Sequence, residues 1–166
     1  MALSAVAAFY LVPDLHLSGV LAAAIPASGG WFRSPRDTFW DVLRASRRQL
    51  DPFTAGSGWV FNTLDLYLED RHRLTYSAFG DATVGDPLSL ARGSSWLALP
   101  PPAAARLLAA LEPLTLDLGD LVAFITSEHG ADDAAEEATA VQAAFTTLKG
   151  WAREVSPGTT GLLSVG

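Results

Sequence analysis

The last third of the chain constrains the fold most, because an apolar segment follows a long helical pattern there. Residues 132–155 carry apolar side chains at helical spacing, and acidic residues open the segment, where a helix dipole favours negative charge. Ser156, Pro157 and Gly158 then stop the helix, and the apolar segment 161–165 follows. Such a segment is expected to pair as a strand, which ties this part of the chain into a sheet.

The start of the chain also predicts a strand. Residues 6–12 are rich in aromatic and β-branched side chains, and Pro13 ends the run. Short strands are expected over 74–79 and 96–99, whereas the Gly-, Asp- and Ser-rich segment 80–95 is expected to be an irregular surface loop. Helical periodicity predicts five further helices, over residues 15–24, 37–50, 59–72, 103–111 and 117–126. The last of these is also compatible with a buried strand.

Length and composition set the fold class. The chain has 166 residues, of which 49% are hydrophobic and 17% charged, so it can bury a core and is not disordered. No repeat and no interdomain linker is visible. We therefore predict an α+β fold with residues 1–166 in a single domain. Its helices pack on a small mixed sheet that includes both terminal strands.

Composition excludes several classes of partner and chemistry. A net charge of −7 disfavours binding to nucleic acid, which needs a surplus of Lys and Arg. The absence of cysteine excludes disulfides, thiolate metal sites and a cysteine nucleophile. The apolar run at the start has no basic residue and ends at Pro13, too early for a membrane span. A soluble, cytoplasmic protein is expected, without nucleic-acid or membrane partners.

No motif for a metal, a cofactor or a catalytic residue is complete. The histidines at 16, 72 and 129 lack the spacing of a helical zinc site, and the acids around His129 are better explained as helix-end residues. The Gly-rich segment 54–58 precedes a helix, but Trp59 stands where a phosphate-binding loop has its lysine. We predict no cofactor and no metal, and a function without catalysis is favoured.

The order of the elements resembles a family of uncharacterised bacterial proteins called YfbM-like. The Gly-Asp-Pro-Leu-Ser motif at 85–89 is similar to a Pro-Leu motif in a Gly-rich loop of that family. The other matching segments are 9–12, 59–68, 96–111 and 148–166. The basic segment 31–49 departs from the family pattern. The family has no settled activity, so the resemblance implies a bacterial origin and a fold but no reaction.

The leading hypothesis for function is a protein-interaction or binding module. Residues 31–49 contain five Arg and only two acids, whereas residues 112–137 contain eight acids and no Lys or Arg. Aromatic and Arg side chains are enriched at protein interfaces. The predicted binding residues, for a homodimer or a protein partner, are Trp31, Arg36, Trp40, Arg44 and Arg47. Alternatively, the aromatic residues belong to the core, or the two charged regions meet within one molecule.

Two other functions stay open. A small hydrolase or ligand-binding enzyme would have a cleft lined by the segment 80–96, with His72, Asp81 and Asp86 available for proton transfer. An immunity-type protein that neutralises a toxin would fit the small size and the acidic character of the chain. Neither alternative has a specific sequence signature.

Overall fold

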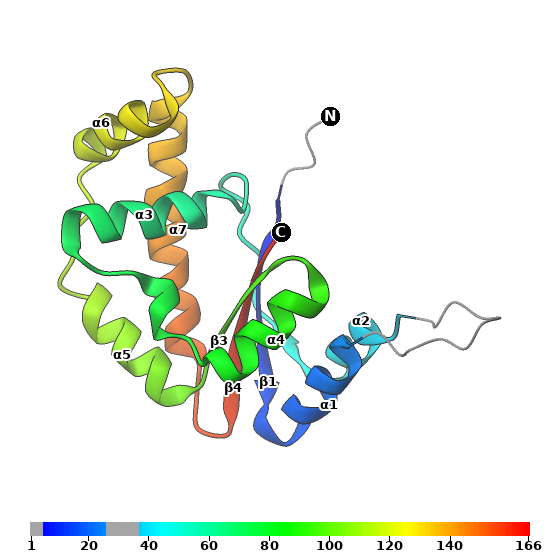
Figure 1. Ribbon diagram of the computed structural model, residues 1–166. Coiled ribbons are helices and arrows are strands. Elements are labelled where there is room, and N and C mark those ends of the chain that lie inside the picture. Colours follow the sequence, from blue (N-terminus) through cyan, green and yellow to red (C-terminus); the bar gives the residue numbers. More distant parts are fainter. Residues whose placement is uncertain (1–4, 26–36) are drawn as a thin grey trace.

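An antiparallel sheet runs through the middle of the molecule (Figure 1). The computed structural model describes residues 5–25 and 37–166. In these residues the sheet has four strands in the order β2-β1-β4-β3. Their bounds are β1 (Ala7–Pro13), β2 (Arg48–Gln49), β3 (Ser95–Leu99) and β4 (Thr159–Val165). The two predicted terminal strands are neighbours, with Ala7 opposite Val165. The α+β class is confirmed, but each pair of strands is antiparallel, so the expectation of a mixed sheet is wrong.

Helices cover both faces of the sheet (Figure 1). On one face lie α3, α5 and α7, with α6 packed on α3 and α7, and on the other face lie α1, α2 and α4. The helices are α1 (Asp14–Ala24), α2 (Phe39–Ser46), α3 (Val60–His72), α4 (Ala82–Arg92), α5 (Pro101–Leu111), α6 (Leu118–His129) and α7 (Ala134–Glu154), with a short 3-10 helix η1 (Tyr76–Phe79). No helix in these residues combines the length and the apolarity that a bilayer crossing requires.

Burial on both faces explains why β1 is apolar on both sides and why β4 has two adjacent leucines. Successive side chains of a strand point to opposite faces. In β4, Leu162 belongs to the core under α1, α2 and α4, and Leu163 belongs to the core under α3, α5 and α7. The same alternation places Phe9 and Tyr10 of β1 in different cores. A strand with one wet face would instead have alternated apolar and polar residues.

A stack of aromatic rings joins the sheet to two helices. The Trp151 ring lies against Phe9 at a centroid distance of 5.4 Å, and against Phe61 at 5.6 Å. Gly161 makes room for this stack, because a Cβ there would lie 2.3 Å from the Phe9 ring. Residues of β1, α3 and α7 that are remote in sequence therefore meet around one tryptophan.

Three sequence predictions of local structure are wrong. The second helix ends at Ser46 rather than at residue 50, because the chain becomes extended at Arg47 and pairs with β1 as β2. The expected strand at 74–79 contains η1 instead. The expected loop at 80–95 contains the helix α4, in which Val84 and Leu88 bury one face. Pro87 had suggested a loop, but tertiary packing keeps the helix intact around it. The ambiguous segment 117–126 is helical, as α6.

Candidate functional site

A cleft with a volume of about 320 Å³ lies over β3, between the end of the sheet and the segment from α3 to α4. Leu97, Leu163 and Val165 give it an apolar floor. Its polar lining includes the side chains of Asp65, Asp81, Asp86, Asn62, Ser77 and Ser89. Cavities of about 300–1,000 Å³ with an apolar lining and a few polar groups are the usual form of small-ligand sites. This one is at the small end of that range.

Two glycines allow the wall of the cleft to approach β3. A Cβ on Gly85 would lie 2.9 Å from the carbonyl oxygen of Trp96, which is too close for a real side chain. A Cβ on Gly80 would lie 2.2 Å from Cδ1 of Leu97. Ser89 completes the contact, because its hydroxyl accepts a hydrogen bond from the Trp96 backbone N–H at 2.9 Å. Helix α4 is therefore held on the edge strand at short range.

Asp65 is a partly buried carboxylate that lines the cleft. It lies on α3, and its side chain accepts hydrogen bonds from the backbone N–H groups of Tyr76 at 2.6 Å and Ser77 at 3.4 Å, and from the Ser77 hydroxyl. Burial raises the pKa of the Asp65 carboxyl, and the hydrogen bonds from Ser77 and Tyr76 offset part of that rise. Asp65 therefore connects α3 to η1 and also lines the cleft.

The two predicted cleft acids, Asp81 and Asp86, both line this cavity. Asp81 caps α4, since its Oδ1 accepts hydrogen bonds from the Thr83 backbone N–H at 2.9 Å and from the Thr83 hydroxyl at 2.6 Å. Asp86 is exposed on α4 and has no hydrogen-bond or ion-pair partner among the described residues. Gly85, Asp86 and Ser89 of the Gly-Asp-Pro-Leu-Ser motif all contribute to the lining.

The charge in the cleft has one sign. Among the described residues that line it, three are Asp and none is Lys, Arg or His. A phosphate or carboxylate ligand would meet three carboxylates there and no compensating cation. A divalent metal needs several donors that converge on one point, and no group of acidic or histidine side chains within residues 5–25 and 37–166 has that arrangement.

His72 is not among the residues that line this cleft. It ends α3, and its ring lies 6.0 Å from the Tyr67 ring, on the side of the helix that meets α6. Its Nε2 is buried and has no hydrogen-bond partner among the described residues. The structure therefore separates His72 from Asp81 and Asp86, the two acids with which it was grouped.

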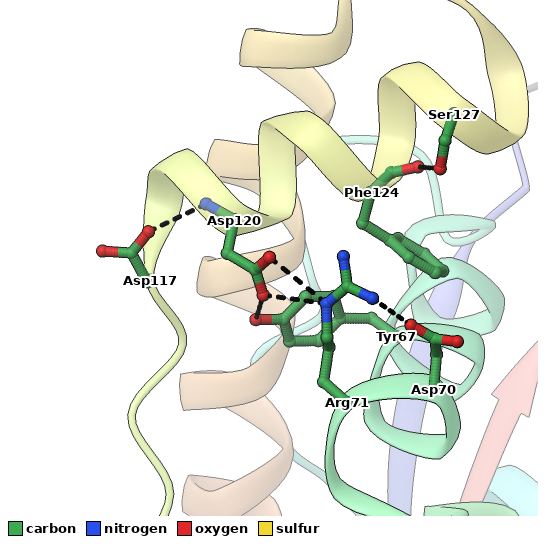
Figure 2. A network of polar contacts seen from close by, with 7 residues as sticks. All are labelled: Tyr67, Asp70, Arg71, Asp117, Asp120, Phe124 and Ser127. Carbon is green, nitrogen blue, oxygen red and sulfur yellow. Dashed lines mark hydrogen bonds and ion pairs between the residues drawn. The ribbon is translucent and has the colours of Figure 1, made fainter.

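A polar network connects α3 to α6 (Figure 2), and it includes Tyr67, whose ring contacts His72. The Tyr67 hydroxyl donates to Asp120 Oδ2 at 2.8 Å, and Nε of Arg71 donates to the same carboxylate at 3.1 Å. Asp117 caps α6 by accepting the Asp120 backbone N–H at 2.8 Å. Hydrogen bonds from Arg71 and Tyr67 lower the pKa of the Asp120 carboxyl. The groups in this network satisfy one another, which indicates a structural clamp between two helices.

The structure describes three of the five predicted interface residues. Trp31 and Arg36 lie outside the described residues. Trp40 is 39% exposed, while its neighbour Phe39 is buried in the core. Arg44 is exposed and lies 3.6 Å from Asp41. Arg47 places its guanidinium over the Tyr10 ring, with 5.2 Å between Cζ and the ring centroid.

The two oppositely charged regions are not joined by an ion pair within the described residues. Arg48 pairs with Glu154 at 2.9 Å, and Arg44 pairs with Asp41, so neither reaches the acidic region 112–137. In that region Glu112 pairs with Arg153. These contacts therefore do not support the alternative in which the two charged regions meet and neutralise each other inside one molecule.

Sequence reasoning missed Asp65 as a site residue. In the sequence it belongs to the polar side of a helix, and its partner Ser77 lies beyond the end of that helix. The two meet because the chain turns back at Arg73, which has a positive φ of 55°. No short motif records such a turn, so no local signal in the sequence marks the contact.

Comparison with known proteins gives no relative. No protein-family model matches the chain, and neither a curated protein nor a solved structure matches it. The resemblance to YfbM-like proteins therefore stays a prediction. Function has to be inferred from the geometry and charge of the cleft.

Proposed function

We propose that the protein is a non-catalytic binding protein, and that the cleft over β3 holds a compact organic cation such as a small alkylamine. The observation that carries this proposal is the sign of the charge. Three carboxylates line an apolar-floored cavity of about 320 Å³, and none of its described lining residues is basic. An ammonium group would be attracted to these carboxylates, and a short hydrocarbon chain would cover Leu97 and Leu163.

The three carboxylates are suited to different roles in this binding. Asp65 and Asp81 are already held by internal donors, so their positions are fixed before a ligand arrives. Asp86 has no partner among the described residues and can accept a hydrogen bond from an ammonium N–H without breaking an existing bond. Asp86 is therefore the residue that we expect to contribute most to affinity.

Binding is favoured over catalysis because the cleft lacks a complete proton-transfer set. His72, the one histidine that was grouped with the cleft acids, belongs to the contact between α3 and α6. The Ser77 hydroxyl is hydrogen-bonded to a carboxylate rather than to a histidine. A serine nucleophile is usually activated by a histidine base that a third group orients. These contacts support a site that holds its ligand without transforming it.

Isothermal titration calorimetry with n-butylammonium, n-butanol and butyrate tests the proposal. The proposal expects n-butylammonium to bind at this cleft and the neutral alcohol to bind it more weakly. Asp86→Asn should weaken n-butylammonium binding by about tenfold, the scale of one charge-assisted hydrogen bond. Asp132→Asn removes the same charge from an exposed position outside the cleft and should leave affinity unchanged. Equal affinity in wild type and Asp86→Asn would refute the proposal, as would the absence of n-butylammonium binding.

Association through the aromatic surface around Trp40 is a second candidate function. It is favoured by the 39% exposure of a tryptophan that otherwise packs against Phe39 and Trp96. Light scattering would measure the mass of the wild type and of Trp40→Ala over a range of concentrations. A dimer that dissociates in the variant would support this function. A wild type that is monomeric at all concentrations would rule out self-association.

A further inference from the structure

A second cavity lies between the segment 55–59, the start of α3 and the first two turns of α7, and its volume is about 360 Å³. We name it the Trp59 pocket. Ala55, Val60 and Ala140 give it an apolar wall. Within the described part of the chain, its charged lining residues are all acids, namely Asp133, Glu136 and Glu137. The pocket is separate from the cleft over β3, because the two cavities share no lining residue.

The indole of Trp59 is presented to solvent at this pocket, since the side chain is 55% exposed. The backbone that precedes it is held by close packing on two other elements. A Cβ on Gly56 would lie 3.0 Å from Cβ of Ala140 on α7, and a Cβ on Gly58 would lie 2.8 Å from the backbone nitrogen of Ala7 on β1. The Gly-rich segment before α3 therefore allows the chain to pack tightly, and this packing fixes the position of Trp59.

Two of the three carboxylates are available to a ligand. Asp133 is the N-cap of α7, where an aspartate usually accepts a backbone N–H of the first turn, yet it has a φ of 60° and its side chain forms no capping bond. Glu136 is exposed and has no hydrogen-bond or ion-pair partner among the described residues. Only Glu137 is engaged, by the Thr63 hydroxyl at 2.8 Å and by Nδ1 of His129 at 3.3 Å. The pocket therefore attracts a cation and repels a phosphate.

An exposed indole beside available carboxylates suits a guanidinium better than a simple ammonium. A guanidinium is planar, so its face can stack on the indole while its edge donates paired hydrogen bonds to a carboxylate. An ammonium group is a compact, strongly hydrated charge without a flat face. The apolar wall formed by Ala55 and Val60 would contact the methylene groups that carry the guanidinium.

We propose that the Trp59 pocket binds an arginine side chain on the surface of a protein partner. A protein is favoured over a small guanidino compound because exposed apolar surface continues beyond the pocket. Val6 is 58% exposed, and its backbone lies against Gly58, the residue before Trp59. Tryptophan and arginine are enriched among the residues that contribute most to protein interfaces. The net charge of −7 also favours the approach of a basic partner.

The test adds acetyl-leucyl-arginyl-leucine amide to the folded protein and follows its NMR signals. The pocket predicts shifts of the Trp59 indole N–H signal, identified as the one that Trp59→Leu removes, and of the Asp133 backbone amide. The amides of Ser89 and Leu97, in the cleft over β3, should not shift. Binding of n-butylammonium to that cleft is a separate measurement, so the two sites can fail independently.

A pair of matched variants tests the carboxylate. Asp133→Asn removes the charge and keeps a residue type that tolerates a positive φ. It should weaken peptide binding by about tenfold, the scale of one charge-assisted hydrogen bond. Asp51→Asn makes the same change at an exposed position outside the pocket and should bind the peptide as the wild type does. Equal affinity in the wild type and in Asp133→Asn would overturn the proposal.

Further probes decide what the pocket recognises. The peptide with citrulline in place of arginine has the same shape without the charge and should bind at least about tenfold more weakly. The lysine peptide should also bind more weakly, and equal binding of either peptide overturns the assignment to arginine. n-Propylguanidinium leaves the surface around Val6 uncovered, so equal binding of this small cation overturns the assignment to a protein partner. Shifts confined to other surfaces, or no shifts in the wild type, overturn the site itself, even if a variant does not fold.

Discussion

Two adjacent leucines of β4 should be equally important for stability, because they point into different cores. Leu162 is 0% exposed and Leu163 is 1% exposed, and they lie on opposite faces of the sheet. Truncation of a buried leucine to alanine lowers the free energy of unfolding by about 2–5 kcal/mol. We expect Leu162→Ala and Leu163→Ala each to lose an amount in this range. The same substitution at Leu90, which is 89% exposed, should change it by less than about 0.5 kcal/mol.

Thermal and urea unfolding followed by circular dichroism would measure these three variants. For a domain of this size, about 1 kcal/mol corresponds to a change in Tm of about 2–4 °C. Each β4 variant should therefore lose about 4–20 °C, and Leu90→Ala should lose less than about 2 °C. The urea midpoint gives a second reading of the same difference, provided that the slope of the transition is unchanged.

A large asymmetry between the two β4 variants would refute this reasoning. If Leu162→Ala cost less than about 1 kcal/mol while Leu163→Ala cost several, α1, α2 and α4 would not form a packed layer. If instead Leu163→Ala cost little and Leu162→Ala cost several kcal/mol, α3, α5 and α7 would not form a packed layer. A loss at Leu90 as large as that at Leu163 would show that α4 buries a face that the structure leaves exposed.

Three further predictions test local features. Gly85→Ala should lower the free energy of unfolding by about 1–3 kcal/mol, because its Cβ would clash with β3. Gly150→Ala has no described atom within 4 Å of the new Cβ and should raise the free energy of unfolding by up to about 1 kcal/mol, and thermal unfolding would measure both variants. In an alkaline absorbance titration, the folded protein should have less than half of its tyrosine ionised at pH 10.0, because burial raises the pKa of all three tyrosines, that of Tyr67 to about 12. The stability that the neutral Tyr67 contributes is present below pH 10.0 and is lost as the pH rises through about 12. The pKa of Asp120 is lowered from 3.8, so its stabilisation is present above 3.8 and lost as pH falls through the folded value; Asp120→Asn should therefore shift the urea midpoint more at neutral pH than in strong acid.

The features that the sequence predicts well are those that depend on local pattern. Strand β1 is apolar along its length, β4 is mostly apolar over residues 161–165, and α7 has a clear helical period with acids at its start, so all three are identified. Helix α4 is missed because Pro87 and nearby glycines outweigh a weaker signal, the four-residue spacing of Val84 and Leu88. Local propensity is a weak guide where packing against β3 stabilises the helix.

The candidate site is only partly predictable for a related reason. Asp81 and Asp86 belong to the segment that sequence composition singles out, and they do line the cleft. Asp65 reaches the cleft through a contact with Ser77 that depends on the turn after α3. His72 contacts Tyr67 on the side of α3 that faces α6, and the Tyr67 hydroxyl donates a hydrogen bond to Asp120, which is distant in sequence. Contacts between remote segments leave no mark in a local pattern.

The position of β4 has a consequence for how the protein emerges from the ribosome. Strands β1 and β3 are both made before β4, yet they do not pair with each other, since β4 lies between them. Until residues 159–165 have been synthesised, an apolar strand such as β1 has its β4-facing edge unsatisfied, a state that invites wrong pairing with other chains. A delay in translation before residues 159–165 leave the ribosome should therefore increase the demand for chaperones.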